Sequence, residues 1–171
     1  GYHGLFGLAL KSIKALEMIS QHLNGYTIVV YSADKIVIDY CNGISKKLGL
    51  NFKIYSAQKN LTQDEMYTLF SKSRIYVGMS KSDGISTSLL ESMALGSFPI
   101  QANTSCANEW IINNKSGYII DPNKIKFISR KILIAINNDK LVNKAAILNW
   151  KTIATRADSN KIKKIIRNIY M

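Results

Sequence analysis

Hydrophobic positions along the chain alternate between two spacings, and this alternation is the main structural signal in the sequence. Apolar residues recur at helical spacing in the segments 5–23, 34–48, 87–95, 107–113 and most of the chain after 124. A further helix is predicted to start at 62–66. Short β-branched or aromatic runs, typical of buried strands, occupy 26–31, 52–55, 74–79, 98–100 and 117–120. Strands and helices that alternate in this way form βαβ units, in which helices cover both faces of a parallel sheet. The pattern therefore predicts an α/β fold, a Rossmann-like doubly wound parallel sheet in one domain over residues 1–171, with a helical C-terminal part at about 124–171.

Local signals fix several helix ends. Thr62 and Glu65 have the spacing of a capping box, which predicts a helix start. Gly49 follows a predicted helix and is expected to end it. The helical part near the C-terminus is expected to consist of three pieces, with breaks near 137–138 and 157–158.

The start of the chain does not fit a complete domain of this type. A doubly wound domain normally opens with its central strand, whereas the first element predicted here is a helix that only residues 1–4 precede. We therefore expect the chain to be a trimmed fragment of a longer protein, in which the central strand lies upstream.

Composition excludes several classes of protein. Hydrophobic residues make up 47% and charged residues 20% of the 171 residues, which is enough apolar material for a packed core and argues against disorder. The longest apolar stretches without a charge are about 8 residues, far short of the roughly 20 that a membrane-spanning helix needs. Two cysteines, Cys41 and Cys106, indicate a reducing compartment rather than a disulfide scaffold, and two histidines are too few for a multi-histidine metal site or a histidine-based triad. We therefore expect no secreted mini-protein, membrane channel or zinc finger.

The net charge of +12 is concentrated towards the C-terminus, where residues 121–171 carry 12 basic and 3 acidic side chains. Such a segment suits nucleic acid, an anionic lipid surface or another acidic surface. Codon bias is the competing explanation, because Lys outnumbers Arg by 19 to 4. Nucleic-acid-binding proteins favour Arg for its bidentate contacts, and the sequence has no basic stripe interleaved with aromatic residues, so we expect no nucleic-acid partner.

The last predicted helix has an apolar face and a basic face. Its isoleucines are Ile162, Ile165, Ile166 and Ile169, and its basic residues are Lys161, Lys163, Lys164 and Arg167. At helical spacing most of the basic residues lie opposite the isoleucines, as in a helix that lies on a membrane surface. Two interpretations remain open, namely peripheral contact with an anionic membrane and an ordinary solvated face.

The loop after the predicted strand at 74–79 carries the residues best suited to chemistry. In an open α/β sheet, ligands bind at the carboxyl ends of the strands, where loops lead into helix N-termini. Asp83 and Gly84 lie in this loop, residues 86–88 supply a helix cap and free amides, and Glu91 follows about one turn into the helix. Free amides at a helix start favour an anion, and carboxylates accept hydroxyl groups, so the segment suits a phosphate ester of a polyol.

The same residues also have a purely structural interpretation. Asp83 and Gly84 form a common turn sequence, and Ser88 and Glu91 have the spacing of a capping box. The apolar residues within 89–94 would then simply be the buried face of a helix. The physics of this segment alone leaves both interpretations open.

Three blocks in a fixed order resemble a known family. They run from Asp83 to Ile100, then Asn-Glu-Trp-Ile-Ile at 108–112, then Lys-Ser-Gly-Tyr-Ile-Ile-Asp-Pro at 115–122. They are similar to the C-terminal, nucleotide-sugar-binding domain of family 4 retaining glycosyltransferases, enzymes of the two-domain GT-B architecture. The family pattern is Glu-x7-Glu, then Ala-Met-Ala-x-Gly-x-Pro-Val, a Glu-Val/Trp-Ile segment and Asn/Ser-Gly-x-Leu-Val-x-Pro. The similarity extends from about residue 25 or earlier to about residue 168, nearly the whole chain.

The resemblance implies a role for each matching residue. Asp83 stands at the first motif glutamate, which contacts the donor sugar or its phosphate, and Glu91 stands at the second, which binds the ribose hydroxyls. These two are the predicted catalytic residues. The backbone at the helix start would receive the diphosphate, Tyr55 and Ser56 would hold the nucleobase, and Glu109 would lie beside the donor pocket. The predicted donor-binding residues are Tyr55, Ser56, Gly84, Ile85, Ser86, Thr87, Ser88, Leu89 and Glu109.

The sequence departs from the family pattern at three points. Asp83 is one methylene shorter than the family's glutamate, which moves its carboxylate by roughly an ångström. The basic Arg and Lys-Gly pair that neutralises the diphosphate is not visible, and His3-Gly4 stands at the Lys-Gly position. The family's N-terminal domain, which holds the acceptor, is absent from this chain.

The resemblance implies the donor half of a bacterial glycosyltransferase. The full-length enzyme would transfer a hexosyl unit from a nucleotide-diphosphate sugar, expected to be a UDP-sugar, to a polysaccharide or lipid-linked acceptor, as in O-antigen or capsule biosynthesis; the isolated domain would be inactive. We expect no metal and no cofactor besides the donor substrate, because the sequence lacks the Asp-x-Asp of metal-dependent GT-A enzymes. The expected partners are the donor, the acceptor and the protein's own N-terminal domain, in the cytoplasm or at the inner face of the plasma membrane. Two alternatives remain open, a catalytically inactive nucleotide-sugar-binding module and a basic Rossmann-like interaction domain.

Overall fold

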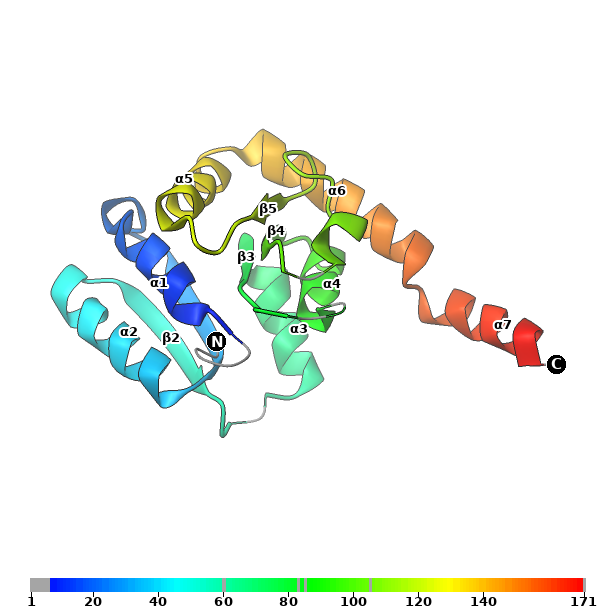
Figure 1. The fold of residues 1–171 in the computed structure, drawn as a ribbon, viewed down its shortest axis with the longest axis horizontal. Helices are drawn as coiled ribbons and strands as arrows, with labels where there is room; N and C mark the ends of the chain where they lie inside the picture. Colours follow the sequence, from blue (N-terminus) through cyan, green and yellow to red (C-terminus); the bar gives the residue numbers. More distant parts are fainter. Residues whose placement is uncertain (1–6, 60, 83, 85, 105, 171) are drawn as a thin grey trace.

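The structure, a computed structural model, describes residues 7–59, 61–82, 84, 86–104 and 106–170 (Figure 1). The strands are β1 (Thr27–Ala33), β2 (Asn51–Ser56), β3 (Ile75–Gly78), β4 (Phe98–Ala102) and β5 (Tyr118–Ile120). The α-helices are α1 (Ala9–Glu17), α2 (Lys35–Leu48), α3 (Gln63–Lys72), α4 (Thr87–Ala94), α5 (Ile125–Ile136), α6 (Asp139–Arg156) and α7 (Ser159–Tyr170). Two short 3-10 helices are η1 (Ser20–His22) and η2 (Cys106–Glu109).

All pairings between the strands that the structure describes are parallel, which confirms the predicted α/β fold. β1 pairs with β2, and β4 lies between β3 and β5. The prediction of one continuous sheet differs from the structure, because the strands form one sheet of two and one sheet of three. β1 is an edge strand of the first sheet and β3 is an edge strand of the second, and in the described part of the chain these two strands do not pair with each other.

The two sheets meet where the start of the chain enters the fold. The Leu8 amide donates to the carbonyl of Met79, just past β3 (2.7 Å), and Gly7 pairs with Ser80. In the dinucleotide-binding strand order, the strand that precedes the first helix lies between the strands that correspond to β1 and β3. The residues that the structure describes include no strand between β1 and β3, so the central strand stays a prediction.

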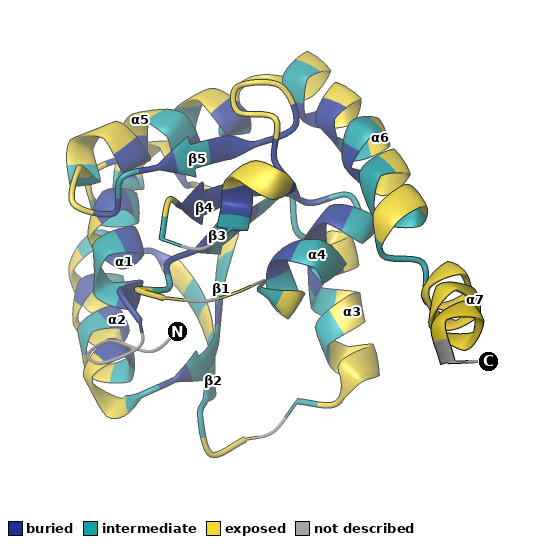
Figure 2. Ribbon diagram, turned by 45° about the vertical axis from the view of Figure 1, so that its right-hand side comes forward, coloured by how far each residue is buried: buried dark blue, intermediate teal, exposed yellow. Residues whose placement is uncertain are grey.

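Helices cover both faces of the strands, as predicted (Figures 1 and 2). On one face α1 packs against α2 and α5, over a core that includes Val37 and Ile132. On the other face α4 packs against α3 and α6, and a second core there includes Phe70, Met93 and Trp110. Among the described helices, none has both the length and the apolar character to cross a membrane.

Local signals predicted most helix ends correctly. The Asp34 side chain accepts a hydrogen bond from the Val37 amide (2.9 Å) at the start of α2, and Gly49 ends that helix with a φ of 67°. The capping box of α3 is complete, because the side chains of Thr62 and Glu65 each bond to the other's backbone amide. The three helical pieces expected near the C-terminus are α5, α6 and α7.

The helix predicted at 5–23 is shorter in the structure. α1 ends at Glu17, and the separate turn η1 follows before β1. The amides of Ile19 and His22 bond to carbonyls three residues back rather than four, which tightens the chain into 3-10 geometry. Residues 5 and 6 of the predicted segment lie outside the described residues.

The prediction of an α-helix at 107–113 is also wrong. The structure has the short 3-10 helix η2 instead. Beyond it, the Ile112 amide bonds to the Ser116 hydroxyl (2.9 Å), and Asn114 adopts a left-handed φ of 64°. A side chain thus takes the place of the helical acceptor, which is how polar residues compete with helix formation.

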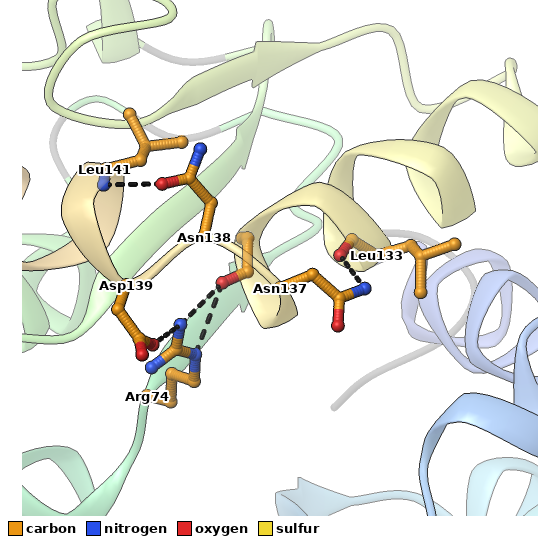
Figure 3. Close-up of polar contacts among 7 residues, drawn as sticks. Arg74, Leu133, Asn137, Asn138, Asp139 and Leu141 are labelled. Atoms are coloured by element: carbon orange, nitrogen blue, oxygen red, sulfur yellow. Dashed lines mark hydrogen bonds and ion pairs between the residues drawn. The ribbon is translucent and has the colours of Figure 1, made fainter.

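Arg74 joins the base of β3 to the turn between α5 and α6 (Figure 3). Its Nε and Nη2 atoms both donate to the carbonyl oxygen of Ala135 (3.2 and 3.1 Å), and Nη2 forms an ion pair with Asp139 (2.6 Å). The side chains of Asn137 and Asn138 bond to backbone groups of the helix ends beside this junction. The Arg74 side chain is 27% exposed and that of Asp139 is 81% exposed. The carbonyl contacts are therefore the stronger part of the junction, since water screens an exposed carboxylate.

Replacing Arg74 tests this ranking. We expect Arg74→Ala to lower the free energy of unfolding by about 1.5–3 kcal/mol, the range for hydrogen bonds that involve a charged group. Asp139→Asn is the matched control and should cost less than about 1 kcal/mol, because only the exposed ion pair is lost. Urea denaturation measures both values, and equal losses in the two variants would contradict the ranking.

Candidate functional site

β3 leads into α4 through a loop at the carboxyl edge of its sheet. Ser86 is the N-cap of α4, and its hydroxyl accepts a hydrogen bond from the Leu89 amide (3.4 Å). The first amides of the helix, including those of Thr87 and Ser88, have no acceptor inside the helix and are therefore available to an anion. Gly84 is exposed, and a Cβ atom there would meet nothing within 4 Å. The approach to the helix start is therefore open at Gly84.

Three predicted residues cannot be placed in this geometry. Asp83, a predicted catalytic residue, and Ile85, a predicted diphosphate contact, lie outside the residues that the structure describes. His3, which stands at the family's Lys-Gly position, also lies outside them. The roles that the sequence suggests for these three residues stay predictions.

The loops that follow β3 and β4 are tied together. The Thr104 hydroxyl donates to the Ser80 carbonyl, and the Cys106 amide donates to the Gly84 carbonyl (3.2 Å). Cys106 is also the first residue of η2, the turn that carries Glu109. These bonds place η2, and with it Glu109, beside the loop that leads into α4.

Tyr31 of β1 is a neighbour of α4 that the sequence analysis did not single out. Burial raises the pKa of Tyr31, hydrogen bonds with Ser88 and Tyr76 lower it, and the nearby Glu91 carboxylate raises it, with a net rise above the usual tyrosine range. Tyr31 therefore keeps its proton at neutral pH. Its ring also packs edge-on against Phe70 of α3, with the ring centroids 6.0 Å apart. One strand residue thus links β1 to β3 and to the first turn of α4.

This contact overturns the structural interpretation of Ser88. That interpretation expected a capping box formed by Ser88 and Glu91, but Ser86 caps α4 and the Ser88 side chain bonds with Tyr31. The sequence carried no signal for this role of Tyr31, because a tyrosine in a β-branched run looks like any other buried strand residue.

Glu91 is half-buried on the second turn of α4. With Tyr67 of α3, Ala94 and Leu95, it lines a shallow hollow of about 150 Å³. Its carboxylate is also close enough to raise the pKa of Tyr31. One short helix therefore presents free amides at its start and a carboxylate about one turn later, so it can hold an anion and a hydroxyl-bearing group together.

β4 carries a buried polar side chain near the same edge. Gln101 is 1% exposed, and its amide nitrogen and oxygen have no hydrogen-bond partner among the described residues. The amide lies over Gly78, the last residue of β3, where a Cβ atom would stand 1.9 Å from Gln101 Oε1. Close packing therefore requires glycine at position 78. The strand pattern gave no reason to single out Gln101.

Tyr55 and Ser56, the predicted nucleobase contacts, end β2 in the other sheet. The Lys53 ammonium lies 5.4 Å from the centre of the Tyr55 ring, and that of Lys59 lies 5.3 Å from it. Within the described part of the chain, no hydrogen bond or ring contact joins Tyr55 or Ser56 to α4. Hydrogen bonds therefore join the loop before α4 to η2, whereas the nucleobase role of Tyr55 and Ser56 stays a prediction.

The cysteines are poor nucleophiles in this structure. Burial raises the pKa of Cys41 to about 11, so the thiol stays protonated at neutral pH. A hydrogen bond with the Glu109 side chain is the main cause that raises the pKa of Cys106. Across the residues that the structure describes, no three His, Cys, Asp or Glu side chains gather in a way that could hold a metal ion.

Comparison with known proteins places the chain in a family. Residues 12–147 match the family described as Glycosyl transferases group 1. The fold is similar to that of the catalytic domain of cholesterol-alpha-glucosyltransferase from Helicobacter pylori (TM-score 0.75, 16% identity, 91% of this chain and 94% of that chain). It is also similar to the C-terminal domain of LpcC, a glycosyl transferase group 1 family protein from Francisella tularensis (TM-score 0.74, 22% identity, 86% and 78%). A third similar structure is HepE from Anabaena in complex with UDP-glucose (TM-score 0.73, 14% identity, 95% and 46%).

No curated protein sequence matches the chain. At these identities the solved structures show the fold alone, which is the Rossmann-like fold of GT-B C-terminal domains. The chain spans less than half of the Anabaena protein's length. The family match covers most of this chain, including the loop after β3 and the whole of α4. The chain therefore belongs to the glycosyl transferases group 1 family.

Proposed function

We propose that this chain is the donor-binding domain of a retaining, family 4 glycosyltransferase. The full-length enzyme transfers a hexosyl unit from a nucleotide-diphosphate sugar, in this proposal a UDP-sugar, to a polysaccharide or lipid-linked acceptor of a bacterial cell. The observation that carries the proposal is α4, where free N-terminal amides and the Glu91 carboxylate lie on one helix inside the segment that matches the family. Similar structures have been solved in complex with UDP and with UDP-glucose, which supports this choice of donor.

In this proposal the chain's own groups supply binding and charge stabilisation. The amides at the start of α4 and its dipole hold the diphosphate, and the negative charge that develops on the leaving diphosphate gains stabilisation there. The Glu91 carboxylate accepts hydrogen bonds from the ribose hydroxyls. Tyr31 keeps the first turn of α4 in place through Ser88. Asp83 contacts the donor sugar, and transfer on one face of the sugar gives retention.

The proposal assigns the remaining parts of the reaction elsewhere in the protein. An N-terminal domain binds the acceptor, and the donor is held in the cleft between the two domains. No metal or further cofactor takes part. The enzyme works in the cytoplasm, with peripheral contact at the inner face of the plasma membrane. Two other functions are candidates, a binding module without turnover and a basic interaction domain. The two tests that follow distinguish them from this proposal, because each function predicts a different result.

The first test concerns the donor. The chain should bind UDP weakly, because the diphosphate and ribose contacts are both on α4. Glu91→Gln should weaken binding by about 1–3 kcal/mol, the range for a hydrogen bond to a charged group. Calorimetric titration of both proteins with UDP measures the difference.

Asp39→Asn is the matched control, because Asp39 is an exposed carboxylate on α2 that pairs with Lys35. It should bind UDP as the wild-type chain does. Unchanged UDP affinity in Glu91→Gln would remove the ribose assignment. No UDP binding by the wild-type chain would favour the basic interaction domain.

The second test concerns turnover. The isolated chain should transfer no sugar from UDP-glucose or another UDP-sugar, because catalysis requires donor and acceptor to be held together by two domains. The measurement follows UDP release in the presence of saccharide acceptors, for the chain alone and for the full-length enzyme. Transfer by the isolated chain at the rate of the full-length enzyme would contradict the two-domain proposal. A full-length protein that binds UDP but never transfers sugar would favour the inactive module.

A further inference from the structure

α6 contacts both of the elements that lie beside the candidate donor site. It packs against α4 on one side (Figure 2). Towards the other side, the buried Asn149 side chain donates to the carbonyl of Ser116, in the turn that follows η2 (2.8 Å). Ile153 and the residue after the helix, Ala157, pack against the core cluster that contains Trp110. α6 therefore fixes the position of η2 relative to α4.

Arg156, the last residue of α6, reaches across to η2. Its guanidinium lies over the Trp110 ring, 4.1 Å from the ring centre, and donates to the Glu109 carbonyl. Trp110 is 8% exposed, and among the described residues no acceptor meets its buried indole N–H. The indole is therefore held by packing and by the cation above it. Arginine suits this position because its planar guanidinium can stack on a ring and donate a hydrogen bond at the same time.

A short chain of contacts continues from η2 to the loop before α4. The Glu109 side chain forms a hydrogen bond with the Cys106 thiol, and the Cys106 amide donates to the Gly84 carbonyl (3.2 Å). Cys106 and Glu109 are the two ends of η2, which has only four residues. A 3-10 turn of this length has few hydrogen bonds of its own, so its position depends on its neighbours. The position of Gly84 thus depends on η2, and that of η2 on Arg156.

We propose that Arg156 is a positioning residue of the donor site. Through η2 it holds the loop before α4 where a diphosphate can reach the first amides of the helix. This inference rests on the proposed function, in which those amides bind the diphosphate. Arg156 acts through Glu109 and Cys106 and need not contact the donor. The competing interpretation is that Arg156 only stabilises the end of α6, and the two interpretations differ in what they predict for ligand affinity.

Calorimetric titration with UDP and with uridine tests the proposal on the 171-residue chain. Arg156→Ala should bind UDP about threefold to tenfold more weakly than the wild type, because the loop at Gly84 is less well placed. Its affinity for uridine, which lacks the diphosphate, should equal that of the wild type. A residue that only stabilised the fold would change neither affinity in folded protein, and urea denaturation shows that the variant is folded under the conditions of the titration.

Alkylation of Cys106 by iodoacetamide measures the chain of contacts directly. Cys106 is partly exposed, and its bond with Glu109 raises the pKa of the thiol. In Arg156→Ala this bond loosens, so more thiolate is present at a given pH and alkylation should become severalfold faster. Cys41 is fully buried with a pKa of about 11 and serves as the unreactive reference. An unchanged rate at Cys106 in Arg156→Ala would overturn the proposal.

Two further variants serve as controls. Arg130→Ala removes an exposed arginine from α5 and leaves η2 untouched, so it should match the wild type in UDP affinity and in the alkylation rate. Arg156→Lys keeps the charge near Trp110 but lacks the planar guanidinium, so both of its values should fall between those of the wild type and Arg156→Ala. Arg156→Lys also provides the test if Arg156→Ala does not fold.

The outcomes separate this inference from the proposed function. Wild-type UDP affinity in both Arg156 variants would overturn the inference, while donor binding at α4 would be retained. Equal losses for UDP and uridine, or an equal loss in Arg130→Ala, would overturn it as well. Failure of the wild-type chain to bind UDP would remove the proposed function and this inference together.

Discussion

The parallel pairing of β3 with β4 is the constraint on which the rest of the candidate site depends. In this register Gly78 lies opposite Gln101, and the two loops that follow leave from the same edge of the sheet. The bond between Thr104 and Ser80 then joins these loops beside the start of α4. A slip of one residue would turn Gln101 away from the space over Gly78 and bring the core residue Ile100 to the other face. The position of the anion-binding helix start therefore follows from strand pairing.

Most of the fold could be predicted from the sequence because its signals are local. The caps at Gly49 and Thr62 act through side chains and backbone groups a few residues away, so their spacing is sufficient. The failures depend on contacts that spacing does not encode. The helix expected at 107–113 gives way because the Ser116 hydroxyl, which lies in the next turn, takes the Ile112 amide. The division of the strands into two sheets is likewise a property of the pairing edges, which hydrophobic runs do not specify.

The same distinction explains what could be predicted of the candidate site. Ser86 and Glu91 could be found because a helix start and a motif position are features of one continuous segment. Tyr31 and Gln101 could not, because their importance arises from strands that come together only in the fold. Both look like ordinary strand residues in the sequence, although one contacts the first turn of α4 and the other lies over the end of β3. Residues on neighbouring strands that pack against a site are therefore not contained in its sequence motif.

The excess of basic residues has two components, which the structure separates. Arg74 and Arg156 each donate to a backbone carbonyl at a junction between elements, a task that suits the planar, multiply donating guanidinium. Most lysines are exposed, so codon bias is a sufficient explanation for their number. A bias in composition has no period, however. It raises the count of Lys and Ile alike but does not place four isoleucines on one face of α7 with lysines at both edges of that face. The spacing within α7, rather than the net charge of the chain, is therefore the feature that requires a functional explanation.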